Sequence, residues 1–503
     1  MRRILAPARQ RQLLFIETLI DNDDWITLAS ISQKIGCSER ILKNDITDLN
    51  LLFAPFSIDT SRKNGVRIEY PVNYSIDYIY TVFLQESIEF RLLEMLFSAK
   101  DVSESDIYET LYISDSSLKR LINRVNVILA EHSIYISTKP YNLCGDELAI
   151  RNFITHYYGE KYPRGNLPYS TEQLNFLTAV FKRFAKKIDI TLNYPDVNQL
   201  RSATLSNIIR MQQGYSLPNI TATPSFEWVI TNMLEQTEIE HQFLHLFGIV
   251  LTPDTVREIL YVFSKPDFVF NASHLKQKVL SHPDTIGVTV TYIESFLTDL
   301  SNDLDLPIDD IEQLTFEIFN ITVWSSGLNY ILFNKKESFL HYVTTEYPNF
   351  VNKVKEALPR LIFISDYQWK EASFNEFLYT IMIHWPNLTK HLIEQIKPIR
   401  VGVFCDFDEE HSHLIIDILN HHFGSHVQSQ VLEALEEAEA LEESREYDVI
   451  LTTISNMSFK SNHTICINSI PTIHDWKTIQ KIISQNDVHT NAVATKFISF
   501  ENR

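Results

Sequence analysis

The sequence predicts a multidomain, mostly α-helical protein that ends in a small α/β domain. Three observations carry this prediction. Apolar residues recur at helical spacing over most of the 503 residues, glycine is scarce at 11, and strands alternate with helices only after about residue 397. At roughly 100–200 residues per domain, a chain of this length holds several domains.

Composition narrows the class of protein. No apolar run approaches the roughly 18 residues that span a bilayer, and the first segment, MRRILAPARQ, lacks the apolar stretch of a secretion signal. The cysteines are too far apart to form a zinc knuckle or a redox CxxC motif, and they are Cys37, Cys144, Cys405 and Cys466. We therefore expect a cytoplasmic protein with no metal, no cofactor and no membrane partner.

The net charge of −20 is distributed unevenly along the chain. Residues 1–67 contain ten Lys/Arg and eight Asp/Glu, a net of +2, whereas residues 401–503 contain six and sixteen, a net of −10. Because charge acts within each domain, a basic N-terminal face that attracts nucleic acid is compatible with an acidic total.

The first segment has the pattern of a helix-turn-helix. Periodic apolar residues predict three helices, over residues 10–21, 27–36 and 38–53. Thr27 and Ser38 are suitable N-caps for the second and third helices, and Gly36 is a suitable residue to end the second.

The third predicted helix has an apolar and a polar side. The face predicted to be buried holds Ile41, Leu42, Ile46 and Leu49. Arg40, Lys43 and Asn44 lie on the other side near the start of the helix, where a recognition helix meets base edges in the major groove. Arg suits guanine and Asn suits adenine, so these three residues are candidate DNA contacts.

A basic hairpin, SIDTSRKNGVRIEYP, follows this helix. Asn64-Gly65 predicts a tight two-residue turn, and Arg62, Lys63 and Arg67 flank it. A basic hairpin after a recognition helix is typical of a winged helix-turn-helix, whose wing contacts phosphate. The alternative is that the three helices and the hairpin form only a packing module, and the exposed basic residues favour the DNA-binding interpretation.

The same pattern recurs 76 residues further on. Residues 114–126 repeat residues 38–50 with Ser, Leu, Lys, Ile and Asn at identical offsets, and the helix before and the hairpin after them recur as well. Lys119, Arg120 and Arg124 give this second recognition helix a basic face. The alternative is a duplicated packing module, because charge on a helix is often only a solvated face.

With these motifs the sequence resembles the Mga family of Gram-positive virulence regulators, to which the anthrax toxin activator is related. The segments that carry the resemblance are SERILKNDITDLN, SLKRLINRVN and LCGDELAIRNFITHYYGEKYP. The last contains the family signature L-x-G-x-E-x-x-I-R-x-F, here Leu143, Gly145, Glu147, Ile150, Arg151 and Phe153. The resemblance spans the chain and is sharpest over residues 10–165.

The resemblance implies five domains. They are a winged helix-turn-helix domain (1–70), a second helix-turn-helix domain (71–165), two helical bundles of the phosphotransferase-system (PTS) regulatory type (170–285 and 286–396) and an α/β domain like enzyme IIB (397–503). Family members bind double-stranded promoter DNA, usually activate transcription and self-associate. The resemblance therefore implies a regulator of virulence or carbohydrate-linked genes that dimerises through its C-terminal domain and has the PTS phosphocarrier protein as a candidate partner.

The bundles lack most of the phosphate chemistry that this resemblance implies. Regulatory bundles typically carry a phosphorylatable His seven residues before an Arg, which corresponds to Arg210 in the first bundle and to Val323 in the second. The positions seven residues earlier are Ala203 and Phe316, and neither side chain can accept a phosphoryl group. His384, on a later predicted helix, is the single candidate for phosphorylation. The alternative is that His384 is a packed core histidine with one hydrogen bond.

The last domain is predicted to be a small parallel sheet. Strands within 399–407, 426–432, 447–453 and 463–469 alternate with helices. Cys405 stands where enzyme IIB carries its phosphocysteine, but the loop after it, residues 406–410, holds four carboxylates that repel a phosphoryl group. We expect Cys405 not to be catalytic.

Other functions share parts of this pattern. A PTS component needs a phosphate-cradling loop beside a nucleophile, and an RNA-binding antiterminator starts with a β-rich domain, whereas this chain starts with predicted helices. A purely structural interaction protein would leave the basic wings without a role. The sequence therefore predicts a DNA-binding regulator and not an enzyme.

Overall fold

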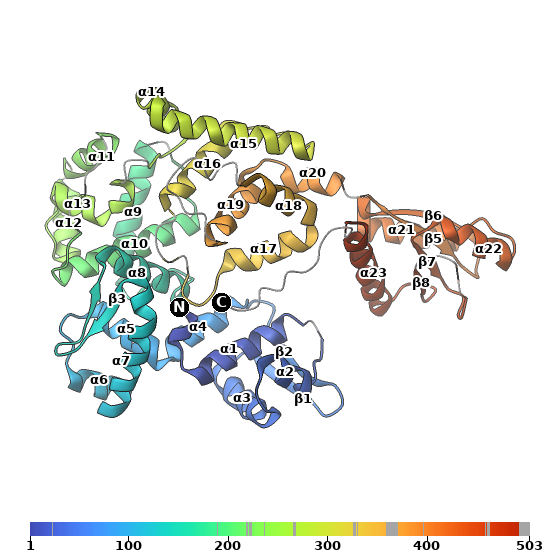
Figure 1. Cartoon of the computed structure of the whole chain (residues 1–503), viewed down its shortest axis with the longest axis horizontal. Coiled ribbons are helices and arrows are strands. Elements are labelled where there is room, and N and C mark those ends of the chain that lie inside the picture. Colours follow the sequence, from blue (N-terminus) through green and yellow to red (C-terminus); the bar gives the residue numbers. More distant parts are fainter. Residues whose placement is uncertain are drawn as a thin grey trace. The chain divides into compact units, whose positions relative to one another are not determined.

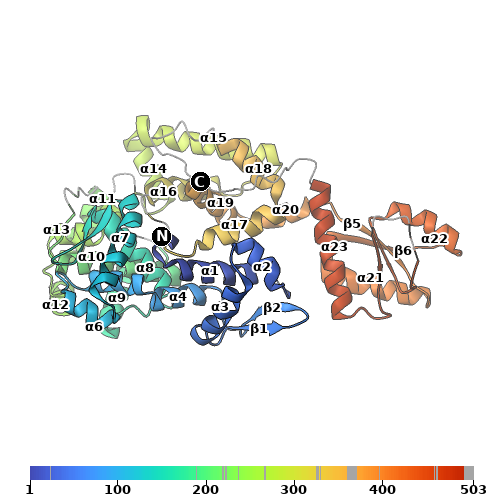
Figure 2. The same ribbon diagram turned by 60° about the horizontal axis from the view of Figure 1, so that its bottom comes forward.

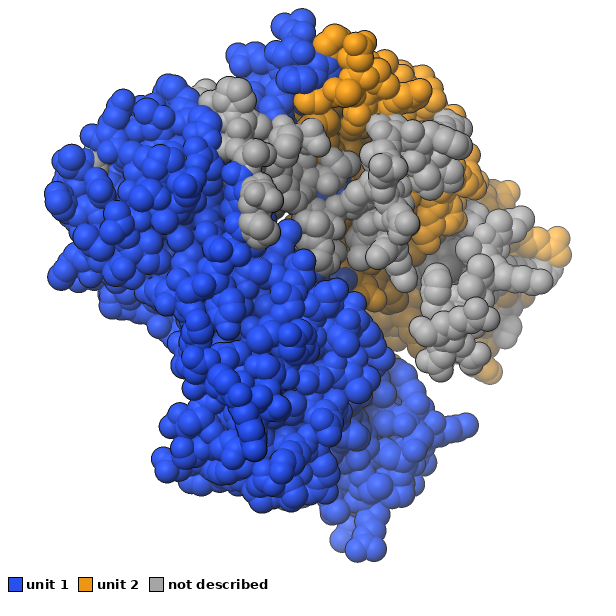
Figure 3. Space-filling model, turned by 60° about the vertical axis from the view of Figure 1, so that its left-hand side comes forward, with its two compact units in different colours: residues 1–282, 320–335 blue, residues 283–319, 336–503 orange. Residues whose placement is uncertain are grey.

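The computed structural model is mostly helical, with small sheets (Figure 1). It describes residues 1–491 apart from 23, 189, 218–219, 221–223, 236, 265–267, 325–327, 329, 359–370, 396, 458 and 460–462. The chain divides into two compact units, residues 1–282 with 320–335 and residues 283–319 with 336–503 (Figure 3). Among the described residues, no helix is both long enough and apolar enough to cross a bilayer.

The first domain contains the predicted three helices and hairpin. Its elements are α1 (Pro7–Ile20), α2 (Leu28–Ile35), α3 (Glu39–Leu52), β1 (Ser57–Ser61) and β2 (Gly65–Glu69). The Thr27 side chain accepts a hydrogen bond from the Ser30 N–H at 3.2 Å, and the Ser38 side chain accepts one from the Ile41 N–H at 3.4 Å. Gly36 ends α2 with φ +72°, so both predicted caps and the predicted helix end are confirmed.

The turn of this hairpin differs from the prediction. Ser61 pairs with Gly65, so the loop has three residues, 62–64, and the predicted two-residue turn is wrong. Gly65 has φ +104°, and a Cβ there would lie 2.2 Å from the carbonyl oxygen of Ile26. Ile26 forms an antiparallel bridge with Val66, with N···O distances of 2.8 and 3.0 Å. Glycine is therefore needed to let residue 26 approach the hairpin.

The second domain repeats the same order of elements. Helix α4 (Asp77–Glu86) precedes it, and its elements are α5 (Ile88–Ser98), α6 (Glu104–Leu111), α7 (Asp115–Leu129), β3 (Ile134–Ser137), β4 (Asn142–Gly145) and α8 (Glu147–Lys161). Ser103 and Ser114 cap α6 and α7. A bridge between Val102 and Tyr141 repeats the one between Ile26 and Val66. The duplication predicted from the sequence therefore extends to the small sheets.

The buried faces of the two recognition helices correspond, with one correction. The buried residues are Leu42, Ile46 and Leu49 of α3 and Leu118, Ile122 and Val125 of α7. Ile41, which was predicted to face the core, is 39% exposed. It lies about 100° around the helix from Leu42, outside the buried stripe.

Helices fill the middle of the chain. The first unit contains α9 (Thr171–Lys187), α10 (Tyr194–Gln212), α11 (Pro224–Leu234), α12 (Thr237–Phe247), α13 (Pro253–Ile259) and α14 (Ala272–Ser281). After a π-helical turn at Pro283–Gly287 come α15 (Val288–Leu304), α16 (Ile311–Trp324), α17 (Lys335–Glu346), α18 (Pro348–Ala357), α19 (Glu371–His384) and α20 (Leu388–Glu394).

The segment between α16 and α17 belongs to the first unit. The Glu160 carboxylate of α8 accepts hydrogen bonds from the backbone N–H groups of Ile331, Leu332 and Phe333 at 2.5, 2.8 and 3.2 Å. Phe333 stacks on Tyr80 of α4 with ring centroids 4.4 Å apart, and Ile331 and Leu332 are fully buried. This segment thus completes the core beneath the second domain.

The C-terminal domain contains the predicted parallel sheet. Strands β5 (Ile399–Phe404), β6 (Val427–Val431), β7 (Val449–Thr452) and β8 (His463–Cys466) lie in the order β6-β5-β7-β8, all parallel. The helices of the domain are α21 (Glu409–Phe423), α22 (Glu437–Glu443) and α23 (Ile473–Asn491). The alternation of strands and helices that the sequence predicted is confirmed.

Candidate nucleic-acid interface

In both N-terminal domains, one asparagine holds the recognition helix to its hairpin. The Asn50 side chain of α3 donates to the Ile58 carbonyl at 3.1 Å and accepts from the Ile58 N–H at 2.6 Å. Asn126 of α7 makes the same pair of bonds to Ile136, at 3.0 and 2.7 Å. The wing and the recognition helix of each domain therefore form one rigid piece.

An ion pair also holds each recognition helix to the first helix of its domain. In the first domain, Asp45 of α3 is buried and accepts from Arg11 of α1 at 2.7 and 2.9 Å. In the second domain, Arg124 of α7 pairs with the buried Glu89 of α5. The recognition helix carries the acidic partner in the first domain and the basic partner in the second, but an ion pair to the first helix fixes its position in both.

The candidate contacts of the first domain lie on its exposed side. Arg40, Lys43 and Asn44 are exposed on α3, and no side-chain partner for them occurs among the described residues. Arg62 and Lys63 are exposed in the loop of the hairpin, which extends beyond α2 and α3 in Figure 2. These five residues are free to meet a nucleic acid.

Arg67 has a different environment from the other candidates of the first domain. It is half-buried, it pairs with Glu69, and its guanidinium lies 4.9 Å from the ring centroid of Trp25. A cation over an aromatic face stabilises the local fold. The contact of Arg67 with DNA stays a prediction, and the structure gives this residue partners within its own domain.

The basic face of the second recognition helix is partly neutralised. Lys119 pairs with Asp115 at 2.8 Å on the exposed surface, and this hydrogen bond lowers the pKa of Asp115. Arg120 is exposed, and its one hydrogen bond within the described part of the chain goes to the Ser116 carbonyl at 3.2 Å, while Arg124 pairs with Glu89. An exposed pair such as Lys119–Asp115 contributes little to stability, so a phosphate can displace the carboxylate.

Lys139 is a further candidate contact that the sequence analysis did not single out. It is exposed at the tip of the second hairpin, and its positive charge also lowers the pKa of Asp115 at the start of α7. The repeat offset of 76 residues makes Lys139 the counterpart of Lys63 in the first wing. Its position in a hairpin that repeats the first wing, where Arg62 and Lys63 stand, was the signal that could have found it.

Two residues of the family signature form a buried charge network. Glu147 accepts from Arg151 at 2.9 Å and from Arg210 of α10 at 2.6 Å, and Arg151 also pairs with Glu258 of α13 at 2.5 Å. Both arginines are 1% exposed. Buried guanidinium groups are stable only when they are paired. Arg210 thus joins the second domain to the first group of helices.

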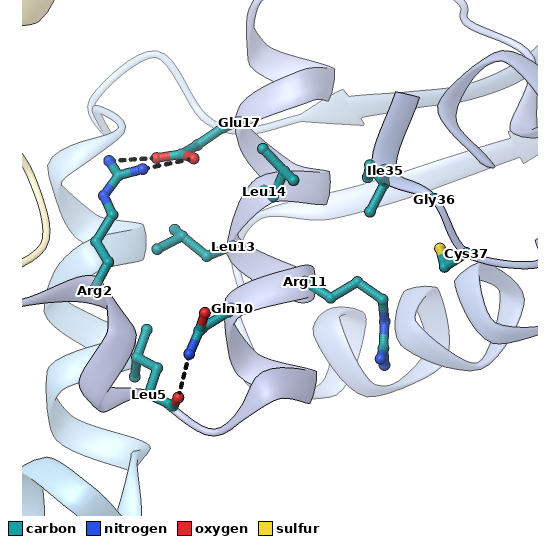
Figure 4. Close-up of a pocket in the computed structure, with 10 residues that line it drawn as sticks. All are labelled: Arg2, Leu5, Gln10, Arg11, Leu13, Leu14, Glu17, Ile35, Gly36 and Cys37. Atoms are coloured by element: carbon teal, nitrogen blue, oxygen red, sulfur yellow. Dashed lines mark hydrogen bonds and ion pairs between the residues drawn. The ribbon is translucent and has the colours of Figure 1, made fainter. Parts of the chain in front are cut away.

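A shallow hollow lies beside the turn between α2 and α3 (Figure 4). It is lined by Arg2, Leu5, Gln10, Arg11, Leu13, Leu14, Glu17, Ile35, Gly36 and Cys37. Arg2 pairs with Glu17 at 2.7 Å, and Arg11 is committed to Asp45. Both cations of the hollow are therefore occupied, and the hollow does not indicate an anion site.

The three positions that correspond to phosphorylatable histidines in regulatory bundles lie on helices α10, α16 and α19. Ala203 is half-buried in α10 and Phe316 is buried in α16. His384, at the end of α19, is half-buried, and its Nδ1 lies 3.5 Å from Glu317, the residue after Phe316. His384 therefore has a carboxylate neighbour on α16.

The loop after β5 is organised by its own carboxylates. Asp406 accepts a hydrogen bond from Thr453 at 2.5 Å, and Asp408 caps α21 by accepting from the His411 N–H at 2.9 Å. Burial raises the pKa of the Cys405 thiol, and the charge of Asp406 adds to the shift. A thiol that stays protonated is a poor nucleophile.

Within the described ranges, no group of three or more His, Cys, Asp or Glu side chains could hold a metal.

Comparisons with known proteins agree with this geometry. Residues 9–61 match the helix-turn-helix domain of the M protein trans-acting positive regulator, and residues 72–158 match the Mga helix-turn-helix domain. A trans-acting regulator of Streptococcus pneumoniae serotype 4 is 23% identical over 94% of this chain and 97% of its own. The capsule synthesis positive regulator AcpB of Bacillus anthracis is 22% identical over 95% and 99%.

The anthrax toxin expression trans-acting positive regulator of Bacillus anthracis is 18% identical over 94% of this chain and 98% of its own. The two matched models cover most of the two domains that the asparagine bonds, the caps and the bridges show to be duplicates. The chain is therefore similar to the two Mga-type helix-turn-helix models over most of its first two domains and, over nearly its whole length, to proteins named as trans-acting regulators.

Proposed function

We propose that this protein binds duplex promoter DNA through its two helix-turn-helix domains and activates transcription from it. The observation that carries the proposal is the duplication of a complete recognition unit. Each unit has a capped recognition helix, a wing bonded to it by an asparagine, and exposed cations beside both. The relatives are named as positive regulators, which supports activation.

The two units differ in the charge that they offer to DNA. In the first, Arg40, Lys43, Arg62 and Lys63 have no acidic partner among the described residues. In the second, Lys119 and Arg124 each have a carboxylate partner. We propose that the first unit supplies most of the phosphate attraction, because only unpaired cations release counterions without first losing a partner.

A titration of the full chain with a promoter fragment at several salt concentrations tests the proposal. Several phosphate contacts give a steep fall of affinity with salt, with a slope that decreases by about one for each contact removed. The double variant Arg40→Ala/Lys43→Ala should lower the slope more than Lys119→Ala/Arg120→Ala. An affinity that is flat in salt, or that neither double variant weakens, would contradict the proposal.

For the C-terminal half we propose two PTS-type regulatory bundles and an enzyme IIB-like domain through which the chain dimerises, with the domain bounds given above. The support is a four-stranded parallel sheet and an exposed Phe407 in the loop after β5. Light scattering over a range of concentrations tests dimerisation. A monomer at every concentration, or a dimer that Phe407→Asp leaves as tight as before, would contradict this role.

His384 is the proposed site of control by the PTS. The Glu317 carboxylate beside Nδ1 favours a proton on that nitrogen and so leaves Nε2 as the nucleophile. Mass spectrometry after incubation with the general PTS proteins and phosphoenolpyruvate should detect one phosphohistidine, and His384→Ala should abolish it. Absence of any phosphohistidine in the unmodified sequence would rule out this form of control.

A further inference from the structure

Tyr112 occupies the turn between α6 and α7, next to the second recognition helix. It is the residue that ends α6, with φ +53° and ψ +45°, and its N–H bonds to the Tyr108 carbonyl at 2.9 Å. The repeat offset of 76 residues makes Tyr112 the counterpart of Gly36, which has φ +72° and ψ +34°. The two turns therefore have the same backbone shape, with glycine in one and tyrosine in the other.

The backbone conformation does not favour tyrosine at this place. In the left-handed region the Cβ of an L-residue crowds the neighbouring carbonyl, so glycine is the residue that adopts this conformation without cost. No neighbouring atom lies within 4 Å of the place where a Cβ would stand on Gly36. The first turn therefore has room for a side chain, and steric crowding by neighbours is not the reason that it has glycine. The tyrosine is thus retained against the preference of the turn.

Packing does not account for the tyrosine either. Its side chain is 89% exposed. Its hydroxyl has no hydrogen-bond partner and its ring no aromatic partner among the described residues. An exposed ring on a disfavoured backbone contributes nothing to the fold, and such outliers concentrate where a ligand is bound.

The surroundings indicate which ligand Tyr112 meets. Two residues later Ser114 caps α7, whose first turn is the part of a recognition helix that enters the major groove. Tyr112 lies in the segment that leads into this helix, and we expect that segment to come near the sugar-phosphate backbone when the helix is in the groove. Tyrosine is among the side chains that donate hydrogen bonds to phosphate oxygens, and such bonds fix the register of a protein on the duplex.

We propose that the Tyr112 hydroxyl donates a hydrogen bond to a phosphate oxygen of bound duplex DNA and positions α7 in the groove. The inference rests on the proposed function and adds to it a contact in the second domain, where Lys119 and Arg124 are paired with carboxylates. It also explains why the glycine of the first turn is replaced in the second.

Three variants of the full chain test this contact by titration with the promoter fragment. Tyr112→Phe removes only the hydroxyl and should weaken binding by roughly five- to ten-fold. The factor should be the same at each salt concentration, because a neutral donor releases no counterion. Tyr112→Gly should weaken binding at least as much while the melting temperature is unchanged or higher, because the backbone strain is relieved.

Ser133→Gly is the matched control. Ser133 is exposed, has φ +60°, and lies beyond the far end of α7 from Tyr112. The variant Ser133→Gly should relieve the same type of backbone strain and leave the affinity for DNA unchanged.

The outcomes separate this contact from the proposed function as a whole. If the unmodified protein binds the fragment and Tyr112→Phe binds it equally well, the hydroxyl contact is refuted and DNA binding stands. If the unmodified protein shows no salt-dependent binding, the proposed function itself fails. Weaker binding of Ser133→Gly to the same degree would assign the effect to the backbone, which also refutes the contact.

Discussion

Replacing Asn50 or Asn126 by alanine should loosen a wing from its recognition helix. Each asparagine makes two hydrogen bonds to the backbone of one buried isoleucine, Ile58 or Ile136, at 2.6–3.1 Å. At about 1 kcal/mol net per hydrogen bond, each variant should lose about 2 kcal/mol of local stability. For a cooperative unit of roughly 300 residues, this corresponds to a fall in Tm of about 3 °C.

Hydrogen exchange tests the prediction locally. Loss of about 2 kcal/mol should speed exchange of the Ile58 or Ile136 amide by about 30-fold, and the two variants should agree because their geometries match. Asn→Asp at either position should cost at least as much, since it keeps the acceptor but sets a second oxygen against the carbonyl. Asn44→Ala, on the exposed side of α3, is the control and should leave exchange unchanged. Costs below about 0.5 kcal/mol at both sites would refute the reasoning.

Three further perturbations follow from buried or crowded positions. Gly65→Ala places a Cβ 2.2 Å from the Ile26 oxygen and should cost roughly 3 kcal/mol, seen as a lower Tm and weaker DNA binding. Glu147→Ala leaves two buried guanidinium groups without their shared carboxylate and should cost roughly 3–5 kcal/mol in thermal unfolding. Because burial raises the pKa of Cys405, its alkylation at pH 8 should be slower than that of the exposed Cys466. The difference between the two alkylation rates should decrease as the pH rises and Cys405 becomes a thiolate.

Each of these has a control within the chain. Gly36→Ala meets no atom within 4 Å and should cost only about 1 kcal/mol of backbone strain, so an equal loss at both glycines would argue against the clash. Glu147→Gln keeps one acceptor oxygen, replaces the other by an NH2 donor and removes the charge, and a loss as small as that of an exposed glutamate would argue against a buried network. Cys405→Ser should leave DNA affinity unchanged, and a loss of binding would give the thiol a role that is not expected here.

Local patterns were sufficient to predict much of this fold. The caps at Thr27 and Ser38, the helix end at Gly36 and the alternation of strands and helices near the C-terminus all depend on residues within a few positions of one another. A repeat adds information of its own, because two stretches with the same pattern support one structural interpretation. That is why the duplicated domain could be predicted without knowledge of any contact between distant residues.

The remaining features depend on partners far away in the sequence. The sequence marks Gly65 as a turn residue, but glycine is needed there because the carbonyl oxygen of Ile26, 39 positions earlier, leaves no room for a Cβ. Arg124 had the spacing of a DNA contact, but Glu89 on another helix binds its guanidinium. The pairing of Glu147 with Arg210 joins residues that the sequence assigned to different domains. Periodicity shows which side of a helix is polar, but it does not show what that side meets.

The place of residues 320–335 has a practical consequence for dissecting this protein. A fragment that stops at residue 282 would keep both recognition units and omit the peptide that carries Ile331 and Leu332. The core that these side chains help to fill and the face of Tyr80 that Phe333 covers would then be open to water, and the Glu160 carboxylate would lose three backbone donors. Such a fragment would be prone to aggregate, and its failure to bind DNA would say little about the recognition units. Fragments for biophysical work should therefore extend past residue 335 or supply that peptide in trans.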